Sequence, residues 1–227
     1  MDIKEKLLNL IFPPVCGFCD EITNQFLCDK CRRKFEQIKV SKIDDYEKDP
    51  VYFDEHFYLF KYEREIRNDL LKYKFKEKSY LFKSYAKLIA EDSVFNKQFI
   101  EKYDFIISVP IHKKRFKTRG YNQSELIAKE LSKLVGKCFL DEVLVKSKNI
   151  VAQSSLDDKL QRIKNIKDAF DSGENIGLVN GKKVAIFDDI FTTGATINEC
   201  AKVLKNKGAE FVGVITLART WVTLQIY

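Results

Sequence analysis

The sequence has no apolar run long enough to cross a bilayer, and its first residues interleave acids and lysines where a signal peptide would be apolar. We therefore expect a cytoplasmic protein, for which any contact with the inner face of the membrane would come through protein partners. Composition argues against disorder, because 45% of the 227 residues are hydrophobic. A chain of this length can bury one substantial core and carry a small additional module.

The sequence has fewer acidic than basic residues and only two histidines. The chain has 33 aspartates and glutamates against 40 lysines and arginines, which gives a net charge of +7. This excess favours nucleic acid or ligands rich in phosphate, although a lysine-rich proteome would produce the same balance. Of the two histidines, His56 stands apart from every motif, so we assign it no role.

The most informative stretch begins with an apolar run at residues 184–187 and continues into Asp188 and Asp189. Four successive apolar residues predict a buried parallel strand, which would deliver both carboxylates to its C-terminal end. Apolar residues then recur with helical spacing over residues 197–207. The small residues between the acids and this helix are therefore predicted to form a strand-to-helix turn.

This predicted turn has the composition of a phosphate-binding site. The first N–H groups of a helix lack internal partners and carry the positive end of the helix dipole, so they attract an anion. The two acids would repel a phosphate unless they accept hydrogen bonds from sugar hydroxyls in the presence of a divalent cation. The implied ligand is thus a phosphorylated ribose. The candidate residues are Asp188, Asp189, Thr192, Thr193, Gly194, Ala195 and Thr196.

A second candidate loop follows another buried-strand run at residues 105–109. Ligand sites in open parallel sheets lie outside the carboxyl ends of the strands, so this loop and the Asp188 turn should face one crevice. A basic loop in that place suits pyrophosphate, and a solvated basic loop is the alternative. The candidate residues are Ile111, His112, Lys113, Lys114, Arg115 and Arg119.

Two C-x-x-C pairs stand near the N-terminus, Cys16 with Cys19 and Cys28 with Cys31. Each pair can chelate Zn²⁺ from a tight knuckle, and together they complete a closed tetrahedral site with no open position for catalysis. A reducing compartment disfavours disulfides, and free thiols would not fall into two matched pairs by chance. We predict a structural zinc that supplies the folding energy of a module with almost no core of its own.

Two basic segments are candidates for contact with nucleic acid. One surrounds the second cysteine pair and includes Arg32 and Arg33; the alternative is a solvated face on a module that docks on the rest of the chain. In the other segment, Lys72, Lys74 and Lys76 alternate with aromatic residues, a pattern that can neutralise a single strand and stack on its bases. Such a pattern more often marks the edge of a core whose lysines reach into solvent, and we favour that alternative.

The Asp-Asp-x-x-Thr-Thr-Gly-x-Thr pattern of residues 188–196 resembles the ribose-5-phosphate loop of type I phosphoribosyltransferases, which bind phosphoribosyl pyrophosphate (PRPP). The resemblance implies that the two acids hold the ribose hydroxyls, that residues 192–196 hold the 5′-phosphate and that Mg²⁺ accompanies the ligand. It also implies that residues 111–114 contact the leaving pyrophosphate. Some purine-salvage relatives carry an acid at the position of Thr192, so this sequence offers no evident general base.

Four elements in order resemble the competence-protein ComF family over nearly the whole chain: the cysteine pairs, the Arg-Gly-Tyr-Asn-Gln-Ser run at residues 119–124, residues 153–170 and the 188–196 pattern. This resemblance implies a role in natural transformation (DNA uptake), in which single-stranded DNA enters the cytoplasm, and partners among the DNA-uptake proteins. Two hypotheses follow. One is an enzyme that transfers ribose 5-phosphate to an unidentified acceptor; the other, which we favour, is a PRPP-binding protein that handles single-stranded DNA without turnover.

Strands and helices alternate over residues 51–227, which predicts an α/β fold with a mostly parallel sheet flanked by helices, similar to a type I phosphoribosyltransferase. A zinc module at residues 1–40 and a linker at residues 41–50 would precede it. Asn122 and Glu125 have the spacing of a capping box for a helix that Gly136 ends, and Cys138 and Cys200 are expected to be buried. Further predicted helices cover residues 3–11, 63–72, 80–95 and part of 153–168, and further strands cover residues 52–62, 143–145 and 211–217.

Overall fold

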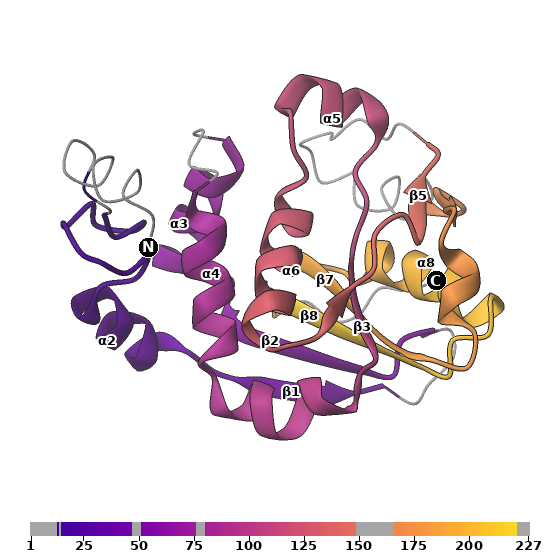
Figure 1. The fold of residues 1–227 in the computed structure, drawn as a ribbon, viewed down its shortest axis with the longest axis horizontal. Helices are drawn as coiled ribbons and strands as arrows, with labels where there is room; N and C mark the ends of the chain where they lie inside the picture. The colour runs from indigo at the N-terminus through magenta and orange to yellow at the C-terminus, as the bar shows by residue number, and fades with distance from the viewer. Residues whose placement is uncertain (1–12, 14, 47–50, 76–79, 149–165, 222–227) are drawn as a thin grey trace, which may run out of the picture.

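The computed structural model describes residues 13, 15–46, 51–75, 80–148 and 166–221. Within them, the main sheet has six strands in the order β1-β2-β8-β7-β3-β4, and every neighbouring pair is parallel except β1 with β2. The predicted α/β fold with a mostly parallel sheet is confirmed (Figure 1). The strands are β1 (Lys42–Asp45), β2 (Glu55–Lys61), β3 (Phe105–Ser108), β4 (Cys138–Phe139), β7 (Lys183–Phe191) and β8 (Phe211–Arg219).

Helices cover both faces of this sheet. Ala185 and Phe187 of β7 belong to one apolar core, which α4 and α6 complete, while Val184 and Ile186 belong to a second core, completed by α8. A separate antiparallel ribbon consists of β5 (Leu144–Lys146) and β6 (Phe170–Ser172). The helices are α2 (Asp29–Ile38), α3 (Arg64–Phe75), α4 (Leu81–Ala90), α5 (Lys113–Arg119), α6 (Gln123–Leu134) and α8 (Ala195–Asn206), with shorter turns η1 (Phe95–Phe99), η2 (Ile100–Lys102) and η3 (Ile176–Val179).

The cysteine-rich segment is docked on the main body and shares its core. The ring centroid of Phe35, in α2, lies 4.5 Å from that of Phe18 and 5.7 Å from that of Phe60 in β2. The Phe18 ring meets Tyr85 of α4 edge-on at 5.2 Å. Burial of these rings removes apolar surface from water, which stabilises the fold by about 25 cal/mol for each Å² buried. The small module therefore depends on α4 and β2 for its apolar contacts.

The stretch expected to be a linker contributes strand β1 to the sheet, where it pairs with β2. Asp44 lies in an ion pair with Arg219 of β8, and its carboxylate also accepts from Lys42 at 2.8 Å. Short, charged strands are typical of sheet edges, where they discourage pairing with other chains. Because such a strand lacks alternating apolar residues, its sequence resembles that of a loop. The division of the chain into domains stays a prediction.

Most of the other predicted elements are present, with shifted ends. The helix predicted over residues 80–95 ends at Ala90, because Asp92 Oδ1 accepts hydrogen bonds from the N–H groups of Val94 and Phe95 at 3.0 Å and starts a new turn. The predicted helices at residues 3–11 and 153–168 lie wholly or largely outside the described residues.

Gly213 in β8 allows the close approach of Tyr103, and we expect its replacement by alanine to destabilise the fold. A Cβ atom at Gly213 would lie 1.8 Å from the Tyr103 hydroxyl, which donates a 2.5 Å hydrogen bond to the buried Glu55 carboxylate. Displacing Tyr103 should lower the free energy of unfolding by about 2–4 kcal/mol, from overpacking and a broken buried hydrogen bond. Chemical denaturation would measure this, with Gly177→Ala as the control because no atom lies within 4 Å of its added Cβ. A change below about 0.5 kcal/mol would contradict the prediction.

Candidate functional site

The carboxyl end of β7 runs directly into a helix, as the sequence predicts. Strand β7 ends at Phe191 and α8 begins at Ala195, with Gly194 as its N-cap in the left-handed region at φ 79°. A non-glycine residue would be strained in this conformation. Thr193 Oγ1 accepts from the Ala195 N–H at 3.4 Å. Thr192 is exposed, Thr193 and Thr196 are half-buried, and Gly194 and Ala195 are buried.

The two acids at this end of β7 lie in different surroundings. Asp188 Oδ1 accepts from the Ser124 hydroxyl of α6 at 3.0 Å and from the Asp189 N–H at 2.9 Å. Asp189 is only 6% exposed. Burial of Tyr73 in α3 raises the pKa of its hydroxyl, and the negative charge of Asp189 raises it further. Ser124 thus fixes the Asp188 carboxylate from a neighbouring helix. No local pattern predicts this role for Ser124, although the residue belongs to the Arg-Gly-Tyr-Asn-Gln-Ser run.

The residues that follow β3 lie next to this turn, because β3 and β7 are parallel neighbours with Ser108 opposite Phe187. The sequence predicted a basic loop from Ile111 to Arg115, and this expectation is wrong in part. Residues 113–119 form the short helix α5, with His112 as N-cap, whose Nδ1 accepts from the Lys114 N–H at 3.2 Å. Helix α5 buries no residue and so has no apolar face, which is why its sequence has no helical pattern of apolar residues.

The basic residues of α5 differ in exposure. Lys113 and Lys114 are exposed, whereas Arg115 is half-buried. Burial lowers the pKa of Arg115, and the positive charge of Arg119 lowers it further. The second effect means that the two guanidinium groups lie near each other. Arg119 donates to the Gln123 side chain of α6 at 2.8 Å. Two neighbouring guanidinium groups form a favourable site for an anion with several oxygen atoms.

Lys146, in the β5–β6 ribbon, joins this group, and the sequence analysis gave no indication of it. Its ammonium lies 4.9 Å from the Phe170 ring centroid. Burial is the main cause that lowers the pKa of Lys146; the charge of Arg115 lowers it further, and that of Asp188 opposes the shift. Lys146 is therefore within electrostatic reach of both the acidic end of β7 and the basic helix α5.

The capping box predicted at the start of α6 is absent. Asn122 is the N-cap by position, but its side-chain amide donates to the Val109 carbonyl at 3.0 Å and makes no cap hydrogen bond. Glu125 instead accepts from Lys129 at 2.6 Å. Asn122 therefore ties α6 to the end of β3, a long-range contact that wins over the local capping geometry.

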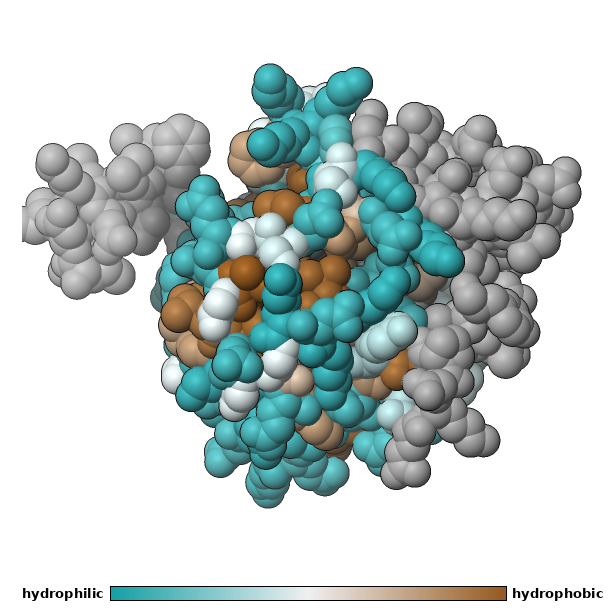
Figure 2. All heavy atoms as spheres, turned by 90° about the vertical axis from the view of Figure 1, so that its right-hand side faces the viewer, coloured by the Kyte–Doolittle hydropathy of each residue, from teal (hydrophilic) through white to brown (hydrophobic). Residues whose placement is uncertain are grey.

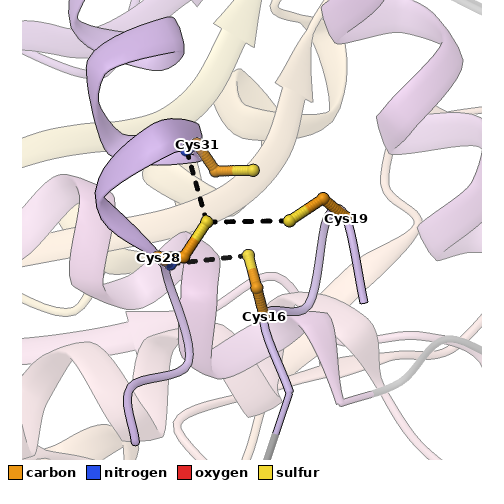
Figure 3. Close-up of side chains that lie close together, drawn as sticks. All are labelled: Cys16, Cys19, Cys28 and Cys31. Carbon is orange, nitrogen blue, oxygen red and sulfur yellow. Dashed lines mark hydrogen bonds between the residues drawn. The ribbon is translucent and has the colours of Figure 1, made fainter. Parts of the chain in front are cut away.

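The four N-terminal cysteines converge, with their sulfur atoms all within 4.8 Å of one another (Figure 3). The Cys28 N–H donates to Cys16 Sγ and the Cys31 N–H donates to Cys28 Sγ, both at 3.5 Å. Cys28 is also the N-cap of α2. All six cysteines of the chain are free thiols, so the disulfide alternative is wrong.

This donor set fits zinc. Burial would raise the pKa of Cys16, yet hydrogen bonds from backbone N–H groups lower it to about 7. Burial and the neighbouring thiols raise the pKa of Cys31, because several thiolates this close repel one another. A divalent cation removes that repulsion, and four thiolates leave no open coordination position. The chain thus has a structural zinc site of the predicted four ligands.

The basic candidates for nucleic-acid contact are mostly paired within the protein. Arg32 lies in an ion pair with Glu91 of α4, whereas Arg33 is exposed and has no ion pair to any described residue. Lys72 pairs with Asp69 at 3.3 Å, and Tyr73 is buried, its hydroxyl donating to the Gln123 carbonyl at 2.9 Å. This arrangement fits the core-edge alternative, and the nucleic-acid role of these residues stays a prediction. Lys74 belongs to the last turn of α3, and Lys76 lies outside the described residues.

The expectation for the two remaining cysteines is half right. Cys200 of α8 is fully buried in the second core, and burial raises the pKa of its thiol. Cys138 is exposed, contrary to expectation. It lies in β4, a strand of two residues at the open edge of the sheet, where one side chain has few neighbours to cover it.

Comparison with known proteins agrees with these features. The phosphoribosyl transferase domain family matches residues 118–221, and the double zinc ribbon domain family matches residues 7–42. Competence protein F of Haemophilus influenzae is 36% identical over 50% of this chain and 49% of its own, and DNA utilization protein YhgH of Escherichia coli O157:H7 is 37% identical over 52% and 50%. The chain thus spans about half the length of these two relatives. Competence protein ComFC of Streptococcus pneumoniae is 29% identical over 90% of this chain and 87% of its own.

The solved structure of a glutamine PRPP amidotransferase from B. subtilis matches 61% of this chain and 26% of the amidotransferase chain. The sequence identity is 20% and the TM-score is 0.39, and a similarity this low supports no inference. None of the helices in the described part of the chain is long and apolar enough to span a membrane.

Proposed function

We propose that the chain, which is similar to competence proteins F and ComFC and matches a double zinc ribbon family ahead of a phosphoribosyl transferase domain family, binds PRPP with Mg²⁺. We further propose that it assists the handling of single-stranded DNA during DNA uptake. The PRPP site would lie at the carboxyl ends of β3 and β7. The single observation that carries this proposal is the arrangement of acids and cations across these two neighbouring strands.

Each part of PRPP has a matching group in this arrangement. The 5′-phosphate would be held by the N–H groups and hydroxyls of residues 192–196 at the start of α8. The ribose hydroxyls would donate to Asp188 and Asp189. The pyrophosphate charge would be balanced by Arg115, Arg119 and the other cations that follow β3. Mg²⁺ would neutralise charge on the pyrophosphate oxygens.

The geometry within the chain supports this order of contacts. The Ser124 hydroxyl donates to Asp188 Oδ1 and so orients this carboxylate, which could then accept from a ribose hydroxyl. Arg115 repels Arg119, and a bound polyanion would remove that repulsion. Residues of α5, α6 and β7 would thus close on the ligand from three elements.

Calorimetric titration of the zinc-loaded full chain with PRPP in the presence of Mg²⁺ tests the proposal. We expect one binding event per chain, much weakened when Mg²⁺ is replaced by a chelator. Ribose 5-phosphate and pyrophosphate, titrated separately, should each bind more weakly than PRPP because each engages half of the site. The absence of binding by folded protein would overturn the proposal.

A second candidate function, transfer of ribose 5-phosphate from PRPP, is favoured by Lys146. In that reaction the bond from the anomeric carbon to pyrophosphate breaks, the pyrophosphate leaves with the electron pair, and an acceptor nucleophile bonds to the carbon. Lys146, whose pKa is lowered by burial and by the charge of Arg115, is the residue that we propose takes the acceptor proton. Release of pyrophosphate when candidate nucleobases are added to the PRPP titration would distinguish transfer from binding alone.

The proposed contact with single-stranded DNA predicts salt-dependent binding. Because cationic side chains displace condensed counterions from DNA phosphates, affinity should fall steeply as salt rises. The exposed Arg33 is the clearest contact, so Arg33→Glu should weaken binding of a fluorescent oligonucleotide and reduce the slope of log K against log salt by about 0.7. Lys133→Glu, an equal charge change on α6 at a side chain 75% exposed, is the control. Equal effects of both variants would show that Arg33 is not a DNA contact.

A further inference from the structure

Helix α5 projects from the top of the molecule in Figure 1 and buries none of its seven residues. An isolated helix shorter than about 12–15 residues is marginal in water, and most helices in proteins are stabilised by packing an apolar face. Phe116 is the aromatic residue of α5, and it is 47% exposed. The helix therefore presents an apolar side chain that the described part of the chain leaves partly uncovered.

A cavity of about 380 Å³ lies beside this helix, at the carboxyl ends of β3 and β4. Ile107, Phe139 and Leu144 give it a mainly apolar wall, and Val145, which also lines it, is 40% exposed. On the face shown in Figure 2, hydrophobic side chains are exposed below the top of the molecule, where α5 lies in Figure 1, and hydrophilic side chains surround them. None of residues 188–196 lines the cavity, so it is separate from the proposed ribose-phosphate site.

Charged residues line the cavity on two sides. Lys113 and Lys117 line it on the side of α5, and Asp141 and Glu142 line it on the side of the β4–β5 segment. Lys129 pairs with Asp141 at 2.8 Å. In contrast, Lys113, Lys117 and Glu142 are exposed and form no ion pair with any other described residue. Unpaired charges of opposite sign therefore flank the apolar wall.

A face of this kind is complementary to a copy of itself. In a dimer with two-fold symmetry, the same patch of both chains forms the interface, and a residue on one edge of the patch meets the opposite edge in the other copy. We propose that this face joins two copies of the chain in such a dimer. The basic side of each α5 lies against the acidic side of the other copy, with Lys117 of one chain near Glu142 of the other. The two apolar walls face each other, and the two Phe116 rings fill the space between them.

The chemistry of this face favours a second copy of the chain over a strand of nucleic acid. An apolar centre with a charged rim is the usual composition of a protein–protein interface, and aromatic residues often dominate its binding energy. The carboxylates of Glu125, Asp141 and Glu142 would repel the phosphates of a nucleic acid. Because the net charge of +7 opposes association of two chains, a dimer needs a local pairing of opposite charges, which the two sides of this cavity supply.

The oligomeric state of the zinc-loaded full chain, measured by sedimentation equilibrium over a range of protein concentrations, tests this assignment. We expect a reversible equilibrium between one chain and two. A chain that stays monomeric at about 100 μM, where even a weak specific dimer would be populated, would overturn the proposal. Growth beyond two chains would overturn the two-fold arrangement, because an interface between identical patches closes at the dimer.

A pair of substitutions at exposed positions locates the interface without disturbing the core. Phe116→Glu removes the central ring and should raise the dissociation constant of the dimer by about tenfold or more. Leu178→Glu is the matched control, because Leu178 is also exposed, at 53%, and does not line the cavity. Equal weakening in both variants, or none in Phe116→Glu, would place the interface elsewhere.

An exchange of charges identifies the residues that meet. Lys117→Glu and Glu142→Lys should each weaken the dimer, because each variant places like charges together twice across the two-fold axis. Both substitutions in one chain reverse the two pairs and should restore the dimer, and an equal mixture of the two single variants should form a mixed dimer. No recovery in the double variant or in the mixture would show that Lys117 and Glu142 do not meet. Neither residue belongs to the proposed PRPP site, so the result does not depend on PRPP binding.

Discussion

Replacement of Cys28 by serine is expected to remove the zinc and to melt the segment around it, with a large drop in the thermal midpoint of the whole chain. Cys28 is a predicted zinc ligand, the N-cap of α2 and a buried member of the first apolar core. Structural zinc contributes about 10–16 kcal/mol of binding free energy in small modules, and that energy is also folding energy. A serine hydroxyl at position 28 can still cap α2, but it removes one of the four thiolate ligands of the zinc.

The unfolding should spread beyond the module because the module shares its core with the main body. Phe18 and Phe35 contact Tyr85 and Phe60, and their release would expose one face of α4 and β2 to solvent. Hydrogen exchange should therefore rise in α2 and along α4, and less in α8, which belongs to the other core. Chelation of zinc from the natural chain should reproduce the pattern.

Thermal melts by circular dichroism and metal content by atomic emission would measure the effect. Cys138→Ser is the matched control, because Cys138 is exposed and lies outside the cysteine cluster. The control should keep one zinc per chain and the natural midpoint. A Cys28→Ser chain that retains zinc and melts at the natural temperature would refute the structural role of the metal.

Replacement of both Asp188 and Asp189 by asparagine is expected to weaken PRPP binding with Mg²⁺ by about 100-fold or more. Hydrogen bonds to charged groups contribute about 1.5–3 kcal/mol each, and each 1.4 kcal/mol is a tenfold change in affinity. The substitutions preserve shape, and an asparagine oxygen at position 188 can still accept from Ser124. The fold should therefore survive, so that loss of affinity reports on the ligand.

The same calorimetric titration measures this variant. Asp171→Asn is the control, since Asp171 is an exposed acid of the β5–β6 ribbon and is not one of the proposed ligand residues. A control with natural affinity and a double variant without binding would support the assignment of the two acids. Natural affinity in the double variant would mean that PRPP, if bound, sits elsewhere.

The sequence alone identified the parts of the site that are contiguous in the chain. The strand, turn and helix over residues 184–207 follow from a local apolar run, a glycine and a helical period, because each of these signals depends only on near neighbours. The cysteine pairs are equally local, since each knuckle brings its own two ligands together. Local signals also gave the alternation of strands and helices, and hence the mostly parallel sheet.

Errors arose where a residue responds to a distant partner. Asn122 has the spacing of a local cap, but its amide is bound by the Val109 carbonyl. Helix α5 buries no residue, and β1 is held by its pairing with β2 and by Arg219, so neither has an apolar period that a sequence pattern could reveal.

Only the tertiary structure decided which groups meet at the ends of β3 and β7. Ser124 reaches Asp188 across 64 positions of sequence, and Lys146 approaches both Asp188 and Arg115 from a separate ribbon. The structure also showed that Arg32 is paired with Glu91, so that Arg33 alone of the two stays open to an outside partner. Hydrogen bonds and charges act through space over a few ångströms, and sequence spacing carries no information on distances that are set by the packing of helices on a sheet.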